Sequence, residues 1–267
     1  MLERERHSLI VKLVATRSFV SVTELLELLD ASEATIRRDI NTLAERGEIK
    51  RIRGGAESVH PRHQPHLVGM PFSLSEQINV PQKRAIARAA AALIEPNDSI
   101  IINGGTTTFA LVEFLENSDL DILTNSFPIA AKLFATSRNR ITLPGGTLFR
   151  EQNIVLSPFE NDTIESFWGN KLFVGCYGLN RFGMMEADPL IVQAQTKLLK
   201  RSEHVIVMAD SSKLRRKSAM IVAGLDRINT IVTDDGAKPE ELEDFRNAGI
   251  KVIVAKVTDE DEIKKLA

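Results

Sequence analysis

Residues 32–43 read Ser-Glu-Ala-Thr-Ile-Arg-Arg-Asp-Ile-Asn-Thr-Leu, and this stretch decides the fold of the N-terminal part of the chain. Ile36, Ile40 and Leu43 recur at helical spacing, so a helix over these residues can bury one face. The other face carries hydroxyl, amide and guanidinium groups, which contact phosphates and base edges in DNA. The stretch therefore predicts a helix that lies in a groove of DNA.

Two further helices are predicted before this one. The first covers residues 3–16, where leucine, isoleucine and valine side chains form one apolar stripe. The second begins after Ser21, and Glu24 stands three residues later, which is the spacing of a capping box. Ser32 can cap the third helix and Gly47 can end it. The order of these signals predicts a helix-turn-helix.

A short β-hairpin is predicted after the third helix. Residues 48–53 alternate apolar and charged side chains, and Gly54 and Gly55 follow as a tight turn. Three helices and a basic hairpin form a winged helix-turn-helix, in which one helix enters the major groove while its neighbours contact the backbone. The residues expected to contact DNA are Ser32, Thr35, Arg37, Arg38, Asn41, Lys50, Arg51 and Arg53.

Bulk composition gives no signature of nucleic-acid binding. The net charge is −2, and the first sixty residues carry ten basic and ten acidic side chains, a difference of zero. Affinity for DNA must therefore come from local placement of charge. Aromatic residues make up only 5% of the chain, so its core must be largely aliphatic. The single Cys176 excludes an internal disulfide, and no apolar run approaches ~18 residues, so a cytoplasmic protein is predicted.

The chain is expected to divide into four parts. A stretch with three prolines follows the hairpin and predicts a linker; its His60, His63 and His66 have no cysteine or carboxylate cluster beside them. A solvated linker is therefore favoured over a metal site, and no cofactor is predicted. The expected parts are residues 1–57 for the winged helix-turn-helix, 58–80 for the linker, 81–256 for a second domain and 257–267 for a C-terminal tail.

The second domain alternates predicted strands and helices. Residues 99–102 form an apolar run suited to a buried strand, and Gly104 and Gly105 follow it before three threonines. This alternation predicts an α/β fold with a mostly parallel sheet covered on both faces, and ligands of such sheets bind beyond the carboxyl ends of the strands. The glycine-threonine loop suits a phosphate, although a plain strand-to-helix turn is about as consistent with its spacing. It matches neither a Walker A loop nor a dinucleotide fingerprint.

The N-terminal motifs resemble those of the DeoR family of bacterial transcriptional regulators. Thr35-Ile36-Arg37-Arg38-Asp39 and Gly54-Gly55-Ala56 stand where that family has them, although Arg53 replaces a common histidine. In the second domain, Asn-Gly-Gly-Thr-Thr, Thr-Asn, Leu-Pro-Gly-Gly and Asp-Ser-Ser-Lys follow the order of the family's effector domain. The resemblance implies that the second domain has a fold similar to that of ribose-5-phosphate isomerase. It also implies that this domain senses a phosphorylated sugar or a related metabolite.

The resemblance also implies an effector site. The phosphate would rest on Gly105, Thr106 and Thr107, and other residues would line the rest of the pocket. The complete implied set is Asn103, Gly104, Gly105, Thr106, Thr107, Thr124, Asn125, Gly145, Gly146, Gly178, Lys197 and Lys213.

Two departures from the family pattern suggest a non-standard or more acidic effector. Asn103 stands where many members have a carboxylate, and Gln193 and Gln195 stand where many have glutamates. Acceptor-only groups have thus become amides that can also donate. A separate set of residues is similar to the subgroup that contains the L-ascorbate utilisation repressor: Asn103, Leu156-Ser157-Pro158, Trp168, Asp188 and Asp210-Ser211-Ser212-Lys213. L-ascorbate 6-phosphate is therefore the effector expected from the resemblance.

The predicted function is a regulator of a carbohydrate-utilisation operon, most simply a repressor, that binds double-stranded operator DNA as a homo-oligomer, either a dimer or a tetramer. One alternative is a sugar-phosphate isomerase fused to a DNA-binding domain. Isomerisation needs a carboxylate base beside the carbon acid, and residues 175–180 contain no carboxylate, so no enzyme activity is expected. A second alternative, an architectural DNA-binding protein, predicts no effect of metabolites on DNA affinity.

Overall fold

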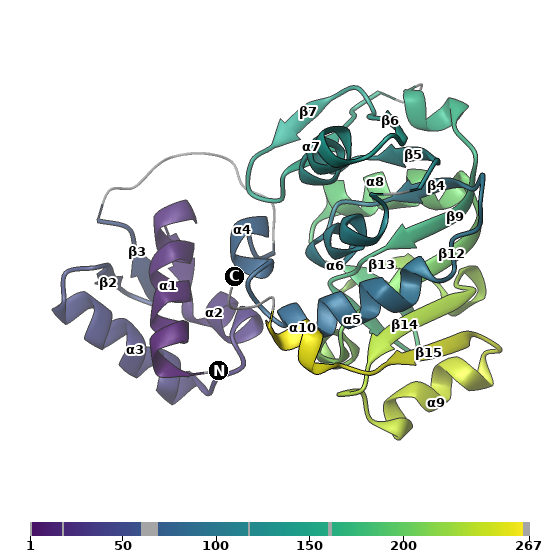
Figure 1. Cartoon of the computed structure of the whole chain (residues 1–267). Helices are drawn as coiled ribbons and strands as arrows, with labels where there is room; N and C mark the ends of the chain where they lie inside the picture. The colour runs from purple at the N-terminus through teal and green to yellow at the C-terminus, as the bar shows by residue number, and fades with distance from the viewer. Residues whose placement is uncertain (1, 18, 60–68, 117, 160–161, 264–267) are drawn as a thin grey trace. The chain divides into compact units, whose positions relative to one another are not determined.

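The computed structural model describes residues 2–17, 19–59, 69–116, 118–159 and 162–263. The chain divides into two compact units, Met1–Ser75 and Glu76–Ala267 (Figure 1). Each unit has its own core, and each is described by itself below. No helix within the described ranges is long and apolar enough to cross a membrane.

The N-terminal unit contains the three predicted helices and the predicted hairpin. Val20 and its neighbours form an additional strand that the sequence reading missed; it pairs with the hairpin in the order β1-β3-β2. A Cβ on Gly55 would lie 2.2 Å from the Val20 carbonyl oxygen, so this pairing requires a glycine there. The elements are α1 (Glu3–Arg17), β1 (Phe19–Ser21), α2 (Val22–Leu28), α3 (Glu33–Glu45), β2 (Lys50–Ile52), β3 (Gly55–Glu57) and α4 (Phe72–Ser75).

The capping signals of this unit are largely confirmed. The Ser21 hydroxyl accepts a hydrogen bond from the Glu24 N–H, as the predicted capping box requires, but the Glu24 carboxylate pairs with Arg17. Gly47 follows α3 with a φ of +71°, a left-handed conformation that favours glycine. Local signals therefore set the ends of these helices correctly.

The C-terminal unit is built on a seven-stranded sheet in the order β15-β14-β12-β9-β4-β5-β6. Each neighbouring pair is parallel, as predicted. The strands are β4 (Ser99–Ile102), β5 (Asp121–Thr124), β6 (Arg140–Thr142), β9 (Gly169–Val174), β12 (Ser202–Met208), β14 (Thr230–Asp234) and β15 (Lys251–Ala255).

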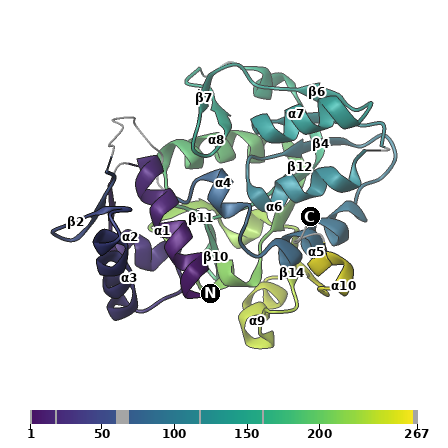
Figure 2. The ribbon, with the colours of Figure 1, turned by 60° about the vertical axis from the view of Figure 1, so that its left-hand side comes forward.

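Helices cover both faces of this sheet (Figures 1 and 2). In β4, Ile101 packs into one core with α8 and α9, whereas Ile100 and Ile102 pack into the other core with α5, η1 and α7. This alternation follows from the two-residue period of a strand. The helical segments are α5 (Val80–Ala91), α6 (Thr106–Phe109), η1 (Ala110–Phe114), α7 (Phe127–Thr136), η2 (Thr163–Ser166), α8 (Pro189–Lys200), η3 (Ser211–Arg215), η4 (Leu225–Arg227) and α9 (Pro239–Asn247).

Two antiparallel additions were not predicted. The first is a three-stranded sheet in the order β10-β11-β13, and the second is the β7–β8 hairpin. Both consist of strands of three or four residues, too short to produce a clear period in the sequence. Their bounds are β7 (Thr147–Phe149), β8 (Ile154–Leu156), β10 (Gly178–Asn180), β11 (Gly183–Glu186) and β13 (Met220–Ala223).

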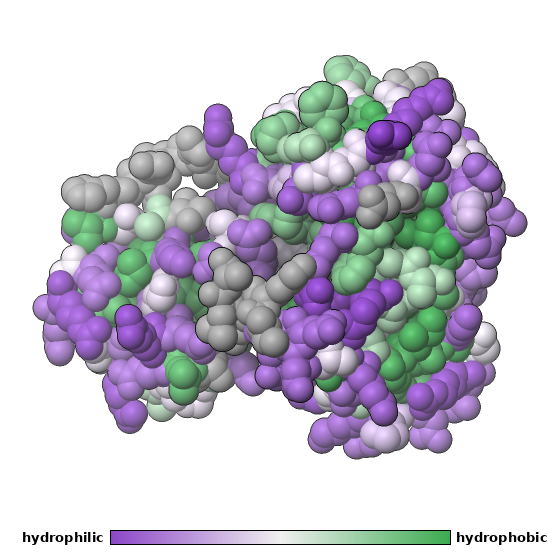
Figure 3. Space-filling model, in the orientation of Figure 1, coloured by the Kyte–Doolittle hydropathy of each residue, from purple (hydrophilic) through white to green (hydrophobic). Residues whose placement is uncertain are grey.

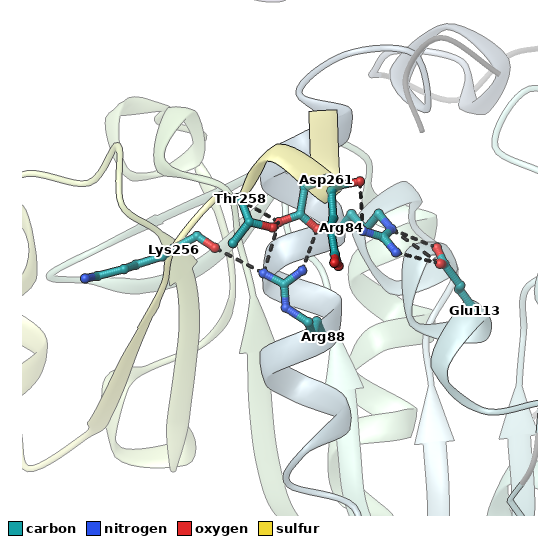
Figure 4. A network of polar contacts seen from close by, with 7 residues as sticks. Arg84, Arg88, Glu113, Lys256, Thr258 and Asp261 are labelled. Atoms are coloured by element: carbon teal, nitrogen blue, oxygen red, sulfur yellow. Dashed lines mark hydrogen bonds and ion pairs between the residues drawn. The ribbon is translucent and has the colours of Figure 1, made fainter. Parts of the chain in front are cut away.

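The predicted linker and tail both contain structure. Helix α4 lies within the expected linker. The three histidines of that linker, His60, His63 and His66, lie outside the described residues. The expected tail contains α10 (Asp259–Ile263), whose Asp261 is fully buried and bonds Arg84 at 2.9 Å and Arg88 at 2.6 Å (Figure 4). This helix is held by partners more than 170 residues away in the sequence, so no local pattern indicates it.

Candidate nucleic-acid interface and candidate ligand site

Helix α3 begins with a complete side-chain cap. The Ser32 hydroxyl accepts a hydrogen bond from the Thr35 N–H at 3.3 Å and lies 2.8 Å from the Thr35 hydroxyl. Both predicted DNA-contacting hydroxyls therefore also fix the start of the helix. Ser32 is exposed and Thr35 is half-buried, so both stay at the surface.

The arginines of α3 face solvent, as predicted. Arg37 pairs with Glu33 one turn earlier, with an N–O separation of 2.6 Å. Arg38 is exposed, and its guanidinium makes no ion pair with any described residue. Asn41 follows one turn after Arg37 and is half-buried. The surface over α3 is accordingly hydrophilic, at the lower left of Figure 3.

The hairpin presents its predicted basic residues to solvent. Lys50, Arg51 and Arg53 are all exposed. Gly54 has a φ of +85° and completes the turn that sets Arg53 at the tip. The eight predicted DNA contacts thus occupy one helix and one hairpin of a single unit.

A buried ionic cluster joins the buried face of α3 to α1. Asp39 is 3% exposed and accepts hydrogen bonds from Arg6 at 2.5 and 3.1 Å and from His7 at 2.9 Å. Burial opposes ionisation of Asp39, but the bonds from Arg6 and His7 outweigh it and lower the pKa of this carboxyl. The sequence reading missed this cluster. The sequence does contain a signal for this cluster, because the acidic Asp39 lies on the same apolar face as Ile36 and Ile40.

In the C-terminal unit, Asn103 joins the ends of two central strands. It follows β4, and its Oδ1 accepts a hydrogen bond from the Gly175 N–H, after β9, at 2.9 Å. Asn125, after β5, accepts a bond from the Gly104 N–H at 2.8 Å. Strands β5 and β6 lie on one side of β4 and the later strands on the other, so this point is the topological switch of the sheet. Ligands of parallel sheets bind in the crevice at such a switch.

The glycine-threonine loop leads directly into a helix. Helix α6 starts at Thr106, with Gly105 as its N-cap. The Thr108 hydroxyl donates to the Asn103 carbonyl at 2.8 Å and also to the Gly105 carbonyl at 3.0 Å. These bonds close the loop, and they explain why β-branched residues can begin a helix here.

Three basic side chains interact with one buried carboxylate that follows β12. Asp210 is 1% exposed, and Lys83, Lys213 and Arg216 each favour its ionised form. Burial lowers the pKa of Lys83 to about 7, and burial together with the nearby Arg216 lowers the pKa of Lys213. Burial of charges that repel one another creates a site suited to an anion. The name cationic cluster is used below for Lys83, Lys213 and Arg216.

The sequence reading found only one member of the cationic cluster. Lys213 was predicted, whereas Lys83 and Arg216 were missed. A signal for Lys83 exists, because this lysine lies on the buried face of α5 together with Ile86 and Ala87. Arg216 stands over the Tyr177 ring at 5.6 Å, a contact that only the fold creates.

Lys197 has polar partners that the sequence did not indicate. Its ammonium bonds the Phe159 carbonyl and lies 3.2 Å from an Asp162 carboxylate oxygen, so its charge is already balanced. It lines a cavity of about 250 Å³ between α8 and the β7–β8 hairpin, two elements that lie together in Figure 2. This cavity is lined by Asn125, Thr147, Phe149, Val155, Leu156, Ser157, Pro158, Asp162, Ile164, Leu190, Gln193, Ala194 and Lys197.

Several other predicted ligand residues have structural roles. Thr124 is fully buried and accepts a bond from the Ser126 N–H. A Cβ on Gly146 would lie 2.3 Å from the Leu156 carbonyl oxygen, and a Cβ on Gly178 would lie 2.6 Å from that of Arg216. These glycines allow backbones to approach closely, a role that does not require a ligand. Gly145 is exposed and has no such neighbour.

The comparisons with known proteins cover both units. Residues 6–62 match the DeoR-like helix-turn-helix domain, and residues 78–235 match the DeoR C terminal sensor domain. The chain is 33% identical to the HTH-type transcriptional regulator UlaR of Shigella sonnei (strain Ss046), over 95% of this chain and 99% of that protein. It is 32% identical, over the same shares, to the UlaR regulator of Escherichia coli O1:K1.

Solved structures give a weaker likeness. Ribose 5-phosphate isomerase A from Methanocaldococcus jannaschii aligns with a TM-score of 0.37 and 14% identity, over 49% of this chain and 52% of that one. A probable sor operon regulator from Shigella flexneri aligns with a TM-score of 0.38 and 13% identity, over 60% of this chain and 88% of that one.

Proposed function

Since this chain belongs to the DeoR family of DNA-binding transcriptional regulators, we propose that it is a repressor whose C-terminal unit binds a phosphorylated sugar or sugar acid. It is a regulator rather than an enzyme, in keeping with the names of its relatives. The N-terminal unit supplies contacts to double-stranded operator DNA through α3 and the β2–β3 hairpin.

The observation that supports an anionic effector is the cationic cluster. Three basic groups interact with Asp210, and burial disfavours the charge on Lys83 and on Lys213. A phosphate dianion would neutralise these charges and accept hydrogen bonds from them. The backbone N–H groups around Gly105 and Thr106 would add donors from the neighbouring loop.

L-ascorbate 6-phosphate is the proposed effector within this class. Support comes from the residues shared with the subgroup of the L-ascorbate utilisation repressor, among them Asn103, Asp188 and Leu156-Ser157-Pro158. The Asn103 amide both accepts from and donates to the Gly175 backbone, with Nδ2 3.5 Å from the Gly175 oxygen. A carboxylate at this position could accept but could not donate, so the amide suits this strand junction.

We place the regulation in a homo-oligomer. A single winged helix offers few base contacts, so two copies on paired half-sites would give the required specificity. The effector would release the operator if it binds more tightly to an arrangement of the copies that does not match the half-sites. Such a shift requires a difference in affinity between the two arrangements.

A thermal-denaturation titration tests the effector site. A ligand that binds only the folded state stabilises it, by about 2.7 kcal/mol when its concentration is a hundred times Kd. We expect L-ascorbate 6-phosphate to stabilise the wild type but to have little effect on Lys213→Gln. Lys217→Gln is the matched control, because Lys217 is exposed four residues later. Equal stabilisation of the wild type and Lys213→Gln by phosphomonoesters would remove Lys213 from the site.

A further inference from the structure

A buried amide oxygen beside the cationic cluster lacks a hydrogen-bond partner. Gln195, on α8, is 3% exposed, and its Oε1 has no partner among the described residues. Its Nε2 donates to Glu186 Oε1 at 2.9 Å and lies 3.4 Å from the Gly175 carbonyl oxygen. A buried acceptor left unpaired costs on the order of 1–3 kcal/mol.

The orientation of this amide follows from its partners. The Gly175 carbonyl can only accept, and the Glu186 carboxylate accepts a further bond from the Tyr177 N–H at 3.2 Å. The amide NH₂ must therefore face these two oxygens, and Oε1 must face away from them. Reversal of the amide would place its oxygen against the Gly175 carbonyl, where the two acceptors would repel each other.

This pair lies at the proposed effector site. Gly175 is the residue that Asn103 joins to the end of β4. Lys213 interacts electrostatically with Glu186, and it also interacts with Asp210. Glu186 is 8% exposed, and burial raises the pKa of its carboxyl to about 7. Two buried acceptors therefore stand next to the basic groups proposed to hold a phosphate.

We propose that Gln195 and Glu186 select the effector by its hydroxyl groups, with the Gln195 Oε1 accepting a hydrogen bond from a hydroxyl of a phosphomonoester. The proposal rests on the effector site described above, in which the cationic cluster holds the phosphate. The ligand class is a phosphomonoester of a polyhydroxylated carbon chain. A carboxylate or a second phosphate at the end of the ligand near Gln195 is disfavoured, because the Gln195 Oε1 and the Glu186 carboxylate are both acceptors.

The geometry also assigns a purpose to glutamine at position 195. A glutamate there would place a carboxylate against the Glu186 carboxylate and the Gly175 carbonyl, without a donor for either. The amide satisfies both and leaves one acceptor unused. We therefore expect Gln195 to contribute to ligand selection and Glu186 to act as the residue that positions it.

Calorimetric titration of two kinds of phosphomonoester separates this inference from the phosphate site. Methyl phosphate has the phosphate without a hydroxyl, whereas L-ascorbate 6-phosphate and D-ribitol 5-phosphate have both. In the wild type, at least one hydroxylated probe should bind more tightly than methyl phosphate. In Gln195→Met, that preference should fall by about tenfold, the effect of one lost hydrogen bond, while methyl phosphate affinity stays within about twofold.

Two further variants keep the test decisive. Lys200→Met is the control, because Lys200 is exposed at the C-terminal end of α8 and should leave the preference intact. Gln195→Glu retains the side-chain shape and should also lose the preference. The selection role of Gln195 would be overturned if both Gln195 variants kept the wild-type preference for hydroxylated phosphomonoesters over methyl phosphate. It would also be overturned if the wild type showed no such preference. Failure of the wild type to bind any probe, methyl phosphate included, would instead overturn the proposed phosphate site and this inference with it.

Discussion

The two candidate sites of this protein are built in opposite ways. The DNA interface comes from one continuous segment, residues 32–53, and its arginines face solvent. The candidate effector site draws on Lys83, Gln195 and Arg216, which are more than a hundred residues apart at the extremes, and its polar groups are largely buried. An exposed site can be recognised from local periodicity, whereas a buried site exists only after the strands are ordered.

The difference is also energetic. Exposed arginines are hydrated and cost little in the free protein. Burial disfavours the charge on Lys83 and Lys213, and Asp210 only partly offsets this effect. A bound phosphate should therefore favour the charged forms of these two lysines. Four predictions follow, beginning with the largest expected effect.

Arg38→Ala should cause the largest loss, because it removes an exposed contact from each copy in an operator complex. A bidentate contact to a base contributes about 1–3 kcal/mol, so two copies lose about 2–6 kcal/mol of operator affinity. Fluorescence anisotropy at fixed salt, with an operator selected from random DNA, measures the loss. Arg4→Ala, an exposed arginine on α1, is the control. Retained affinity in Arg38→Ala would show that α3 is not the recognition helix.

Asp261→Ala should destabilise the C-terminal unit by about 3 kcal/mol, because two buried or half-buried guanidinium groups lose their shared partner (Figure 4). Thermal denaturation followed by circular dichroism measures this effect. Glu262→Ala changes an exposed acid on the same helix and should have little effect. Equal stability of the two variants would mean that α10 contributes nothing to the fold.

Asp39→Asn tests whether the exposed interface is as local as its sequence suggests. Loss of the charge that holds Arg6 and His7 should destabilise the N-terminal unit by about 2 kcal/mol at neutral pH. The folded-state pKa of Asp39 is lowered, so its stabilisation is present above the unfolded pKa and is lost as pH falls through the folded pKa. The free energy of unfolding of the variant should therefore fall less steeply than that of the wild type as the pH is lowered. An equally steep fall in both proteins would contradict an ionic role for Asp39.

The smallest effect concerns pH and the effector site. Lys83 has a pKa of about 7, and a phosphate dianion favours its protonated form, so binding takes up a proton. Affinity for methyl phosphate should fall as pH rises from 7 to 8, by at most about tenfold for each titrating group. Ionisation of Glu186 acts in the same direction. Lys83→Arg should show a shallower fall, measured by calorimetry, and a flat wild-type profile would separate Lys83 from the ligand.

Sequence reasoning performed best where the signals are local. Helices α1, α2 and α3, the Ser32 cap and the Gly47 stop were all predicted, since each depends on residues within one or two turns. It performed less well in the C-terminal unit, where Lys83 and Arg216 were missed and the ion pair of Lys197 with Asp162 was not predicted. The partners of a charged side chain depend on which strands become neighbours, and no local period encodes that.

By itself, the sequence determined a winged helix-turn-helix followed by a parallel α/β domain, because amphipathic periods and capping residues act over short distances. Only the tertiary structure decided which charges meet in the interior. It set Asp39 against Arg6, Asp261 against Arg84, and Lys83 beside Asp210. The physical reason is that burial strengthens electrostatic interactions between residues far apart in the chain, and burial is a property of the packed fold.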